Sequence, residues 1–149
     1  MPVAVEALWA KSGVRQGEPG QALVAHTMAV LDRLAGLRSR QPMLPALCQA
    51  PRLWQRTALA CALHDLGKCA PGFQRMLRDG TRFDHRHEVI SLTLLPWLIG
   101  GDPDGDLPWV AAGIVSHHRE LREIRRLYPP EDPSMDLADG CETLRGVLD

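Results

Sequence analysis

The sequence predicts an all-α domain, a helical bundle, on three observations. Apolar residues recur at helical spacing along almost the whole chain, and no segment of useful length alternates with the period of a strand. The 149 residues are 45% apolar and 23% charged, which is typical of one globular domain. The longest apolar run is far shorter than the roughly 20 residues that cross a bilayer, and no signal peptide is evident. We therefore expect a cytoplasmic protein without membrane contact.

Two helices are expected in the first half of the chain. The first spans about 20–37 and the second about 52–66, separated by a loop over 41–51 that contains three prolines. The second helix is expected to stop at Gly67, because glycine readily takes the left-handed conformation that ends many helices. These helices carry the first two candidate ligand positions.

Three further helices are expected in the second half. A short helix over 73–78 ends before Gly80, and a fourth begins near Arg86, with Pro96 expected to kink or end it. A fifth helix is expected over 109–128. The aspartate-rich stretch 102–106 is interpreted as a turn. Counted from Asp102, the positions where a calcium loop needs glycine and glutamate hold Leu107 and Gly113.

Histidines fall on the sides of these helices that face the core. The candidate metal ligands are His26, His64, Asp65, His87, His117 and His118. A single inward histidine is usually a hydrogen-bonded core residue, but several together need a shared partner, and a divalent metal satisfies several imidazoles at once. Imidazole with carboxylate suits iron, manganese, cobalt, nickel or zinc. The number of ligands exceeds one four-coordinate site, which favours two metals bridged by Asp65.

The ordered motifs around these histidines resemble the HD superfamily of metal-dependent phosphohydrolases. The motifs are His64-Asp65-Leu66-Gly67-Lys68, Ala70-Pro71-Gly72-Phe73-Gln74, Arg86-His87-Glu88 with Ser91, and Ser116-His117-His118. In this finer pattern, residues 23–118 are similar to the HD nuclease domain of the type I CRISPR-associated helicase–nuclease. The resemblance implies an HD-domain helical bundle with its metal site between helices.

The resemblance also implies a role for each motif residue. One metal would be held by His26, His64 and Asp65. The second would be held by Asp65, His87, His117 and His118. Asp65 and Lys68 would be catalytic, with Lys68 contacting the scissile phosphate. Alternatively, Lys68 is a positive charge near the C-terminal end of a helix, where it interacts favourably with the helix dipole.

The implied activity is a metal-dependent nuclease, a hydrolase that cleaves phosphodiester bonds of single-stranded DNA by a metal-activated water. The implied setting is CRISPR antiviral defence, with a helicase domain or subunit and a CRISPR surveillance complex as partners. The expected cofactors are two divalent ions chosen from iron, manganese, cobalt and nickel. Two alternatives stay open: an HD phosphohydrolase acting on nucleotides, and a catalytically silent HD docking module.

Several residues depart from the family pattern or have two interpretations. Arg119 stands where the family has glycine, and neither Asp136 nor Asp139 is assigned to the family's downstream aspartate ligand. His85 matches no family position and is expected near the ligands or at the surface. Glu88 is expected either to orient His87 or to be a surface carboxylate.

The net charge of −1 conceals an uneven distribution. Residues 1–130 hold 16 basic and 12 acidic side chains, whereas 131–149 hold one basic and six acidic side chains. We therefore predict an HD nuclease domain over 1–130 and a separate acidic segment over 131–149, interpreted as the start of a truncated remainder. A basic path for DNA, or else a solvated helix face, is formed by Arg119, Arg122, Arg125 and Arg126.

Overall fold

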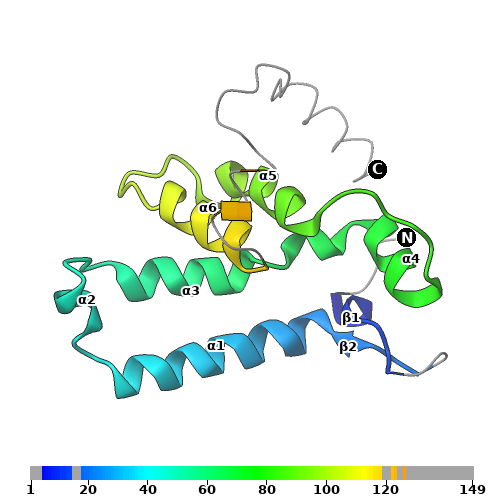
Figure 1. Cartoon of the computed structure of the whole chain (residues 1–149), viewed down its shortest axis with the longest axis horizontal. Coiled ribbons are helices and arrows are strands. Elements are labelled where there is room, and N and C mark those ends of the chain that lie inside the picture. The colour runs from blue at the N-terminus through cyan, green and yellow to red at the C-terminus, as the bar shows by residue number, and fades with distance from the viewer. Residues whose placement is uncertain (1–4, 15–17, 119–121, 124–125, 127–149) are drawn as a thin grey trace.

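The computed structural model describes residues 5–14, 18–118, 122–123 and 126, and it confirms an all-α architecture (Figure 1). Its six α-helices are α1 (Leu23–Arg40), α2 (Leu44–Leu47), α3 (Leu53–Leu63), α4 (Pro71–Asp79), α5 (His87–Ile99) and α6 (Leu107–Ser116). Two 3₁₀ turns, η1 (Val5–Ala7) and η2 (Leu66–Cys69), and two short antiparallel strands, β1 (Trp9–Lys11) and β2 (Gln21–Ala22), complete the described elements.

The helices lie in layers around α3. One side of α3 faces α1, and the other side packs on α6, which in turn packs on α5 (Figure 1). Leu95, Val110 and Ile114 form the core between α5 and α6, and each is at most 1% exposed. Phe73 and Ile90 join α4 to α5. The beginning of α5 is therefore fixed between η2 and α4.

The end of the second expected helix differs from the prediction. Helix α3 ends at Leu63, and the chain continues through a turn at His64 and Asp65 into η2. Gly67 lies inside η2 and does not have a positive φ, so the predicted left-handed stop is wrong. The reason for glycine there is close packing, because an added Cβ would lie 2.0 Å from the carbonyl oxygen of His87.

Helix α1 begins and ends about three residues later than expected, because residues 21–22 form β2, and other expectations also differ. Helix α5 continues through the exposed Pro96 to Ile99. Helix α6 ends at Ser116 and is followed by a turn, so the continuous helix predicted over 109–128 is wrong. Residues 122–123 and 126 are helical, and the other residues beyond 118 lie outside the described part of the chain. The expected loop over 41–51 contains the four-residue helix α2.

The acidic turn before α6 is structural. The Asp102 carboxylate accepts hydrogen bonds from the backbone N–H groups of Asp106 and Leu107, at 2.7 and 3.1 Å. Asp106 accepts hydrogen bonds from the guanidinium groups of Arg52 and Arg56 at the start of α3. These hydrogen bonds lower the pKa of Asp106 to about 2. The turn therefore fastens α6 to α3.

The Asp106 pairs should make stability depend on acid pH. Because its folded-state pKa of about 2 lies below the usual value near 3.8, the stabilisation is fully present above that usual value and lost as pH falls through the folded pKa. Urea unfolding of the wild type and Asp106→Asn between pH 6 and 2 should give a difference that shrinks below about pH 4. The exposed Asp84→Asn is the control, and a pH-independent difference for Asp106→Asn would contradict the assignment.

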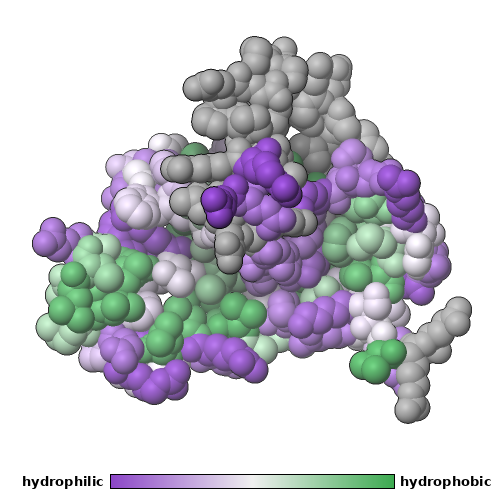
Figure 2. Space-filling model, viewed as in Figure 1, coloured by the Kyte–Doolittle hydropathy of each residue, from purple (hydrophilic) through white to green (hydrophobic). Residues whose placement is uncertain are grey.

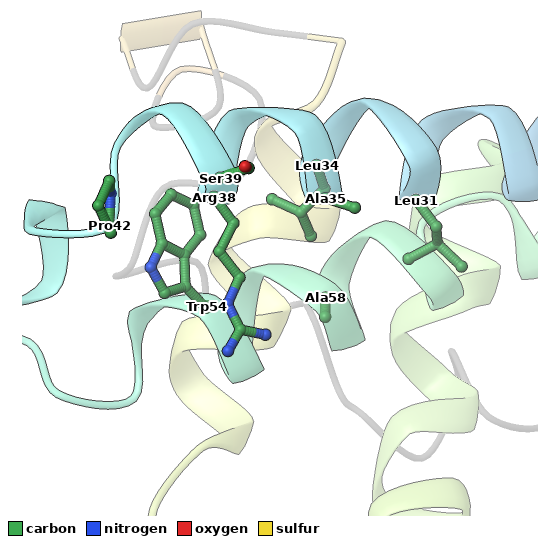
Figure 3. A pocket seen from close by; sticks show the side chains of 8 residues that line it. All are labelled: Leu31, Leu34, Ala35, Arg38, Ser39, Pro42, Trp54 and Ala58. Carbon is green, nitrogen blue, oxygen red and sulfur yellow. The ribbon is translucent and has the colours of Figure 1, made fainter.

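A groove separates the second half of α1 from α3 (Figure 3). It has a volume of about 520 Å³ and is lined by Leu31 and Leu34 on one side and by Trp54 and Ala58 on the other. Apolar surface gathers over α2 and the adjoining parts of α1 and α3 (Figure 2). The described lining residues include no histidine or carboxylate, so the groove lies apart from the candidate ligands.

None of the helices in the described part of the chain combines the length and the apolar character that a membrane span needs.

Candidate metal centre

All six sequence-predicted ligands meet at one end of α3. They are His26 on α1, His64 and Asp65 between α3 and η2, His87 at the start of α5, and His117 and His118 after α6. Their donor atoms form two groups, within each of which the atoms lie within 4.8 Å of one another. One group contains Asp65, His87, His117 and His118, and the other contains His26, His64 and Asp65. Asp65 belongs to both.

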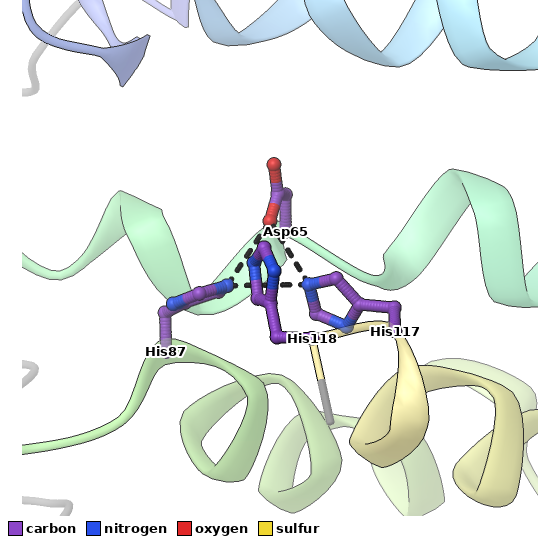
Figure 4. Close-up of side chains that lie close together, drawn as sticks. All are labelled: Asp65, His87, His117 and His118. Carbon is purple, nitrogen blue, oxygen red and sulfur yellow. Dashed lines mark hydrogen bonds and ion pairs between the residues drawn. The ribbon is translucent and has the colours of Figure 1, made fainter. Parts of the chain in front are cut away.

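The Asp65 carboxylate directs one oxygen to each group. Its Oδ1 lies 3.2 Å from Nε2 of His87 and 3.7 Å from Nε2 of His117, and Figure 4 shows this oxygen among the rings. Its Oδ2 lies 3.4 Å from Nε2 of His26 and 3.3 Å from Nε2 of His64, on the side of α1. The carboxylate therefore has the geometry of a bridge.

Hydrogen bonds to the backbone set the direction of two rings. Nδ1 of His64 donates to the carbonyl oxygen of Cys61 at 2.8 Å, and Nδ1 of His117 donates to that of Ile114 at 2.5 Å. A proton on Nδ1 leaves the Nε2 lone pair of a neutral imidazole free, and in both residues Nε2 faces Asp65. This arrangement is the one that prepares histidine to bind a metal.

The Glu88 carboxylate sets the direction of the His87 ring in the same way. Nδ1 of His87 lies 3.4 Å from Oε2 of Glu88, which is 3% exposed and is paired with the Arg86 guanidinium. Burial acts to raise the pKa of Glu88, but hydrogen bonding to backbone and to Arg86 outweighs it and lowers the pKa. The structure thus favours the orienting role for Glu88 over the surface alternative.

Gly67 and Ser91 hold the ligand-bearing backbones together. The Gly67 N–H donates to Oγ of Ser91 at 2.8 Å. The same hydroxyl has two carbonyl oxygens to which it can donate its proton, that of His64 at 3.0 Å and that of His87 at 2.9 Å. Because glycine has no side chain, η2 approaches the first turn of α5 closely enough for these contacts.

The charge of Asp65 is compensated by its surroundings. Burial by itself would raise the pKa of Asp65, but contacts with four side chains outweigh it and hold the pKa far below its usual value. These side chains are His117, His64, His87 and Lys68. Burial lowers the pKa of His26 and of His118, which favours the neutral form that coordinates a metal.

The residues fit a divalent transition metal. Oδ1 of Asp65 is buried, and no described residue gives it a hydrogen bond of good geometry. Nε2 of His87 and Nε2 of His117 face each other at 3.4 Å beside this oxygen. When Nδ1 of each ring carries the proton, as its acceptor favours, these three atoms are all acceptors, and a cation satisfies them. Nitrogen with carboxylate oxygen suits iron, manganese, cobalt, nickel or zinc.

Comparison with known proteins decides the family. Residues 9–136 match the family described as Cas3, HD domain, which is most of the chain. The chain belongs to the Cas3 HD-domain family. The candidate metal centre described above lies within the matched residues.

Two curated relatives carry related names. A Myxococcus xanthus protein with the provisional name CRISPR-associated nuclease/helicase Cas3 is 38% identical over 134 residues, which cover 77% of this chain and 18% of the relative. The CRISPR-associated endonuclease/helicase Cas3 of Thermus thermophilus is 36% identical over 143 residues, which cover 91% of this chain and 14% of the relative. The chain thus spans less than a fifth of the length of either relative. No solved structure matches.

The remaining candidate residues of this Cas3 HD domain lie in different places. Lys68 is buried, and its ammonium donates to Oδ2 of Asp65 at 2.8 Å and to the carbonyl oxygen of Ala10 at 3.1 Å. His85 is exposed and packs edge-on against Phe83, so it belongs to the surface. Arg122 and Arg126 are exposed. Arg119, Arg125, Asp136 and Asp139 lie outside the described residues.

The sequence assigned no role to Gln74, which the structure places beside the centre. Gln74 is 4% exposed, and its amide pairs with both the N–H and the carbonyl oxygen of Trp9, at 2.9 Å each. It also donates to the carbonyl oxygen of Lys68 at 2.7 Å. The only signal in the sequence was a polar residue in the first turn of an amphipathic helix. That signal does not identify its partner, which is the backbone of a strand about 65 residues earlier in the chain.

Removal of the Ser91 hydroxyl should loosen the centre. Ser91→Ala leaves the buried Gly67 N–H without an acceptor, which should lower the free energy of unfolding by about 1–3 kcal/mol. Chemical denaturation in a chelating buffer measures this loss, and metal affinity should fall with it because His64 and His87 are released. The exposed Ser39→Ala is the matched control, and equal stability of the two variants would rule out the role of Ser91.

Proposed function

We propose that this chain is a metal-dependent nuclease domain that hydrolyses phosphodiester bonds of single-stranded DNA in CRISPR antiviral defence. The observation that carries the proposal is the Asp65 carboxylate between two groups of histidines, within a chain of the Cas3 HD-domain family. The domain is proposed to comprise residues 1–130, with 131–149 as a separate acidic segment.

The proposed division of roles follows the two groups. His26, His64 and Asp65 would hold one divalent ion, and Asp65 with His87, His117 and His118 would hold the second. Ions bound there would supply Lewis acidity, which would activate a water and favour charge on the phosphoryl oxygens. Glu88 and the backbone carbonyls behind His64 and His117 keep the rings directed at Asp65.

Lys68 has two proposed functions at this site. Its contact with Oδ2 keeps Asp65 ionised and fixes the direction of the carboxylate. The same positive charge favours the approach of a phosphate, which agrees with the role implied by the family resemblance. Both functions require the ammonium to stay at the position where Asp65 and Ala10 hold it.

DNA binding is proposed to be mainly electrostatic. Arg122 and Arg126 follow the paired histidines by a few residues and are exposed, and Arg119 and Arg125 are proposed to extend this basic path. Aromatic residues make up only 5% of the chain, which limits base stacking. Affinity should therefore decrease steeply with salt concentration. The proposed protein partners are a helicase domain or subunit and a CRISPR surveillance complex.

Circular single-stranded DNA tests the proposal directly. The protein is incubated with manganese, cobalt, nickel or iron, and degradation of the circle indicates an endonuclease. Survival of the circle while mononucleotides are dephosphorylated would instead establish the nucleotide phosphohydrolase. If neither substrate reacts and elemental analysis finds no bound metal, the silent docking module is correct.

A further inference from the structure

The two oxygens of Asp65 have unequal surroundings. The Lys68 ammonium donates to Oδ2 at 2.8 Å, so this oxygen is already partnered by a full positive charge. No described residue donates a hydrogen bond of good geometry to Oδ1. The group of His26, His64 and Asp65 therefore contains a built-in cation, whereas the group on the other side of the carboxylate does not.

The Lys68 ammonium is held in place from behind. Its side chain is 8% exposed, and its second hydrogen bond runs to the carbonyl oxygen of Ala10 in β1. Gln74 fixes that strand through both backbone groups of Trp9, and it also binds the carbonyl oxygen of Lys68 itself. Displacing the ammonium would break hydrogen bonds in a buried region, so it stays beside Oδ2.

We propose that Lys68 makes the two halves of the metal centre unequal. The first divalent ion binds to Asp65, His87, His117 and His118. A second ion binds more weakly to His26, His64 and Asp65, because it must share Oδ2 with a fixed ammonium that repels it. This inference rests on the proposed metal-dependent function, and it makes Lys68 the residue that sets the order of loading.

Ligand number acts in the same direction and must be separated from charge. The group on the Oδ1 side offers four donor residues and the group on the Oδ2 side offers three, among the described residues. If ligand number alone caused the difference, removal of the Lys68 charge would not change the ratio of the two affinities. Substitution of Lys68 therefore isolates the effect of the charge.

Manganese titration of the whole chain, followed by calorimetry and by electron paramagnetic resonance, tests the order of loading. Two steps are expected, with the first at least about tenfold tighter than the second. His118→Ala should weaken the tight step, and His26→Ala should weaken or remove the second step while leaving the tight one. Two steps of equal affinity, or loss of the tight step in His26→Ala, would overturn the order.

Lys68→Met tests the cause. The second step should tighten by at least about tenfold, with a smaller change in the first. Lys68→Gln, which keeps a neutral donor, serves if Lys68→Met fails to fold, and Arg40→Met, which removes an exposed charge at the far end of α1, is the control. An unchanged ratio in the folded variant refutes the role of Lys68. Because the readout is metal binding, unequal steps without DNA cleavage would refute the proposed nuclease and leave this inference standing.

Discussion

Asp65→Asn should remove bound metal from both halves of the centre and abolish DNA cleavage. Each of the two ligand groups depends on an Asp65 oxygen, and asparagine keeps the shape of the side chain while removing its charge. Metal ions contribute several kcal/mol to stabilising a phosphoryl-transfer transition state. The cleavage rate should therefore fall by about a thousandfold or more. Metal content by elemental analysis and cleavage of circular single-stranded DNA measure the two effects.

The exposed Asp32→Asn on α1 is the matched control and should change neither metal content nor cleavage rate. Asp65→Asn also leaves the buried Lys68 ammonium without its carboxylate, so the variant should be less stable even in a chelating buffer. Adding Lys68→Met to Asp65→Asn should recover part of that stability without restoring metal. An Asp65→Asn protein that keeps both ions would show that the carboxylate is not the bridge.

Gly67→Ala should have the largest effect on the fold. The added Cβ would lie 2.0 Å from the carbonyl oxygen of His87 and 2.9 Å from Cβ of Ile90. A backbone atom cannot move aside as a flexible side chain can, so η2 and α5 must separate. We expect a loss of about 3 kcal/mol or more in the free energy of unfolding, at the upper end of overpacking effects. Chemical denaturation in a chelating buffer measures it.

The same substitution should weaken metal binding, because the separation of η2 from α5 moves Asp65 away from His87. A loss of roughly 10–100-fold in affinity is expected, as for other changes behind the ligands. Gly101→Ala provides the control, since nothing lies within 4 Å of an added Cβ there and its φ is outside the left-handed region. Equal stability of the two alanine variants would show that the Gly67 contact is not tight.

The helical fold and the gathering of the candidate ligands could be predicted because they depend on local patterns. Apolar spacing located the helices, and the same spacing placed His26, His87 and His117 on inward faces, where the structure has them. The ends of α3 and α6 were misplaced, because helix termini depend on contacts made elsewhere in the fold. The two short strands left no period in the sequence that could be detected.

The supporting contacts of the site could not be predicted for a related reason. The need for glycine at Gly67 comes from the close approach of α5, and the role of Gln74 comes from the backbone of β1. The sequence shows residue types but not which distant backbone atoms they meet. Glu88 could be predicted only in part. Its neighbour His87 suggested an orienting role, and the burial seen in the structure favours that role over a surface carboxylate.

The bond between Lys68 and the carbonyl oxygen of Ala10 bears on where a working fragment of this domain begins. A fragment designed from the histidine motifs would start at α1, since His26 is the first ligand in the chain. That fragment would lack the peptide group that anchors the ammonium, and Gln74 would lose two of its three acceptor and donor partners. Every candidate ligand would be present, yet the Lys68 ammonium would no longer be held in one position beside Asp65. The N-terminal strand is thus a component of the candidate metal centre that contributes no side chain to it.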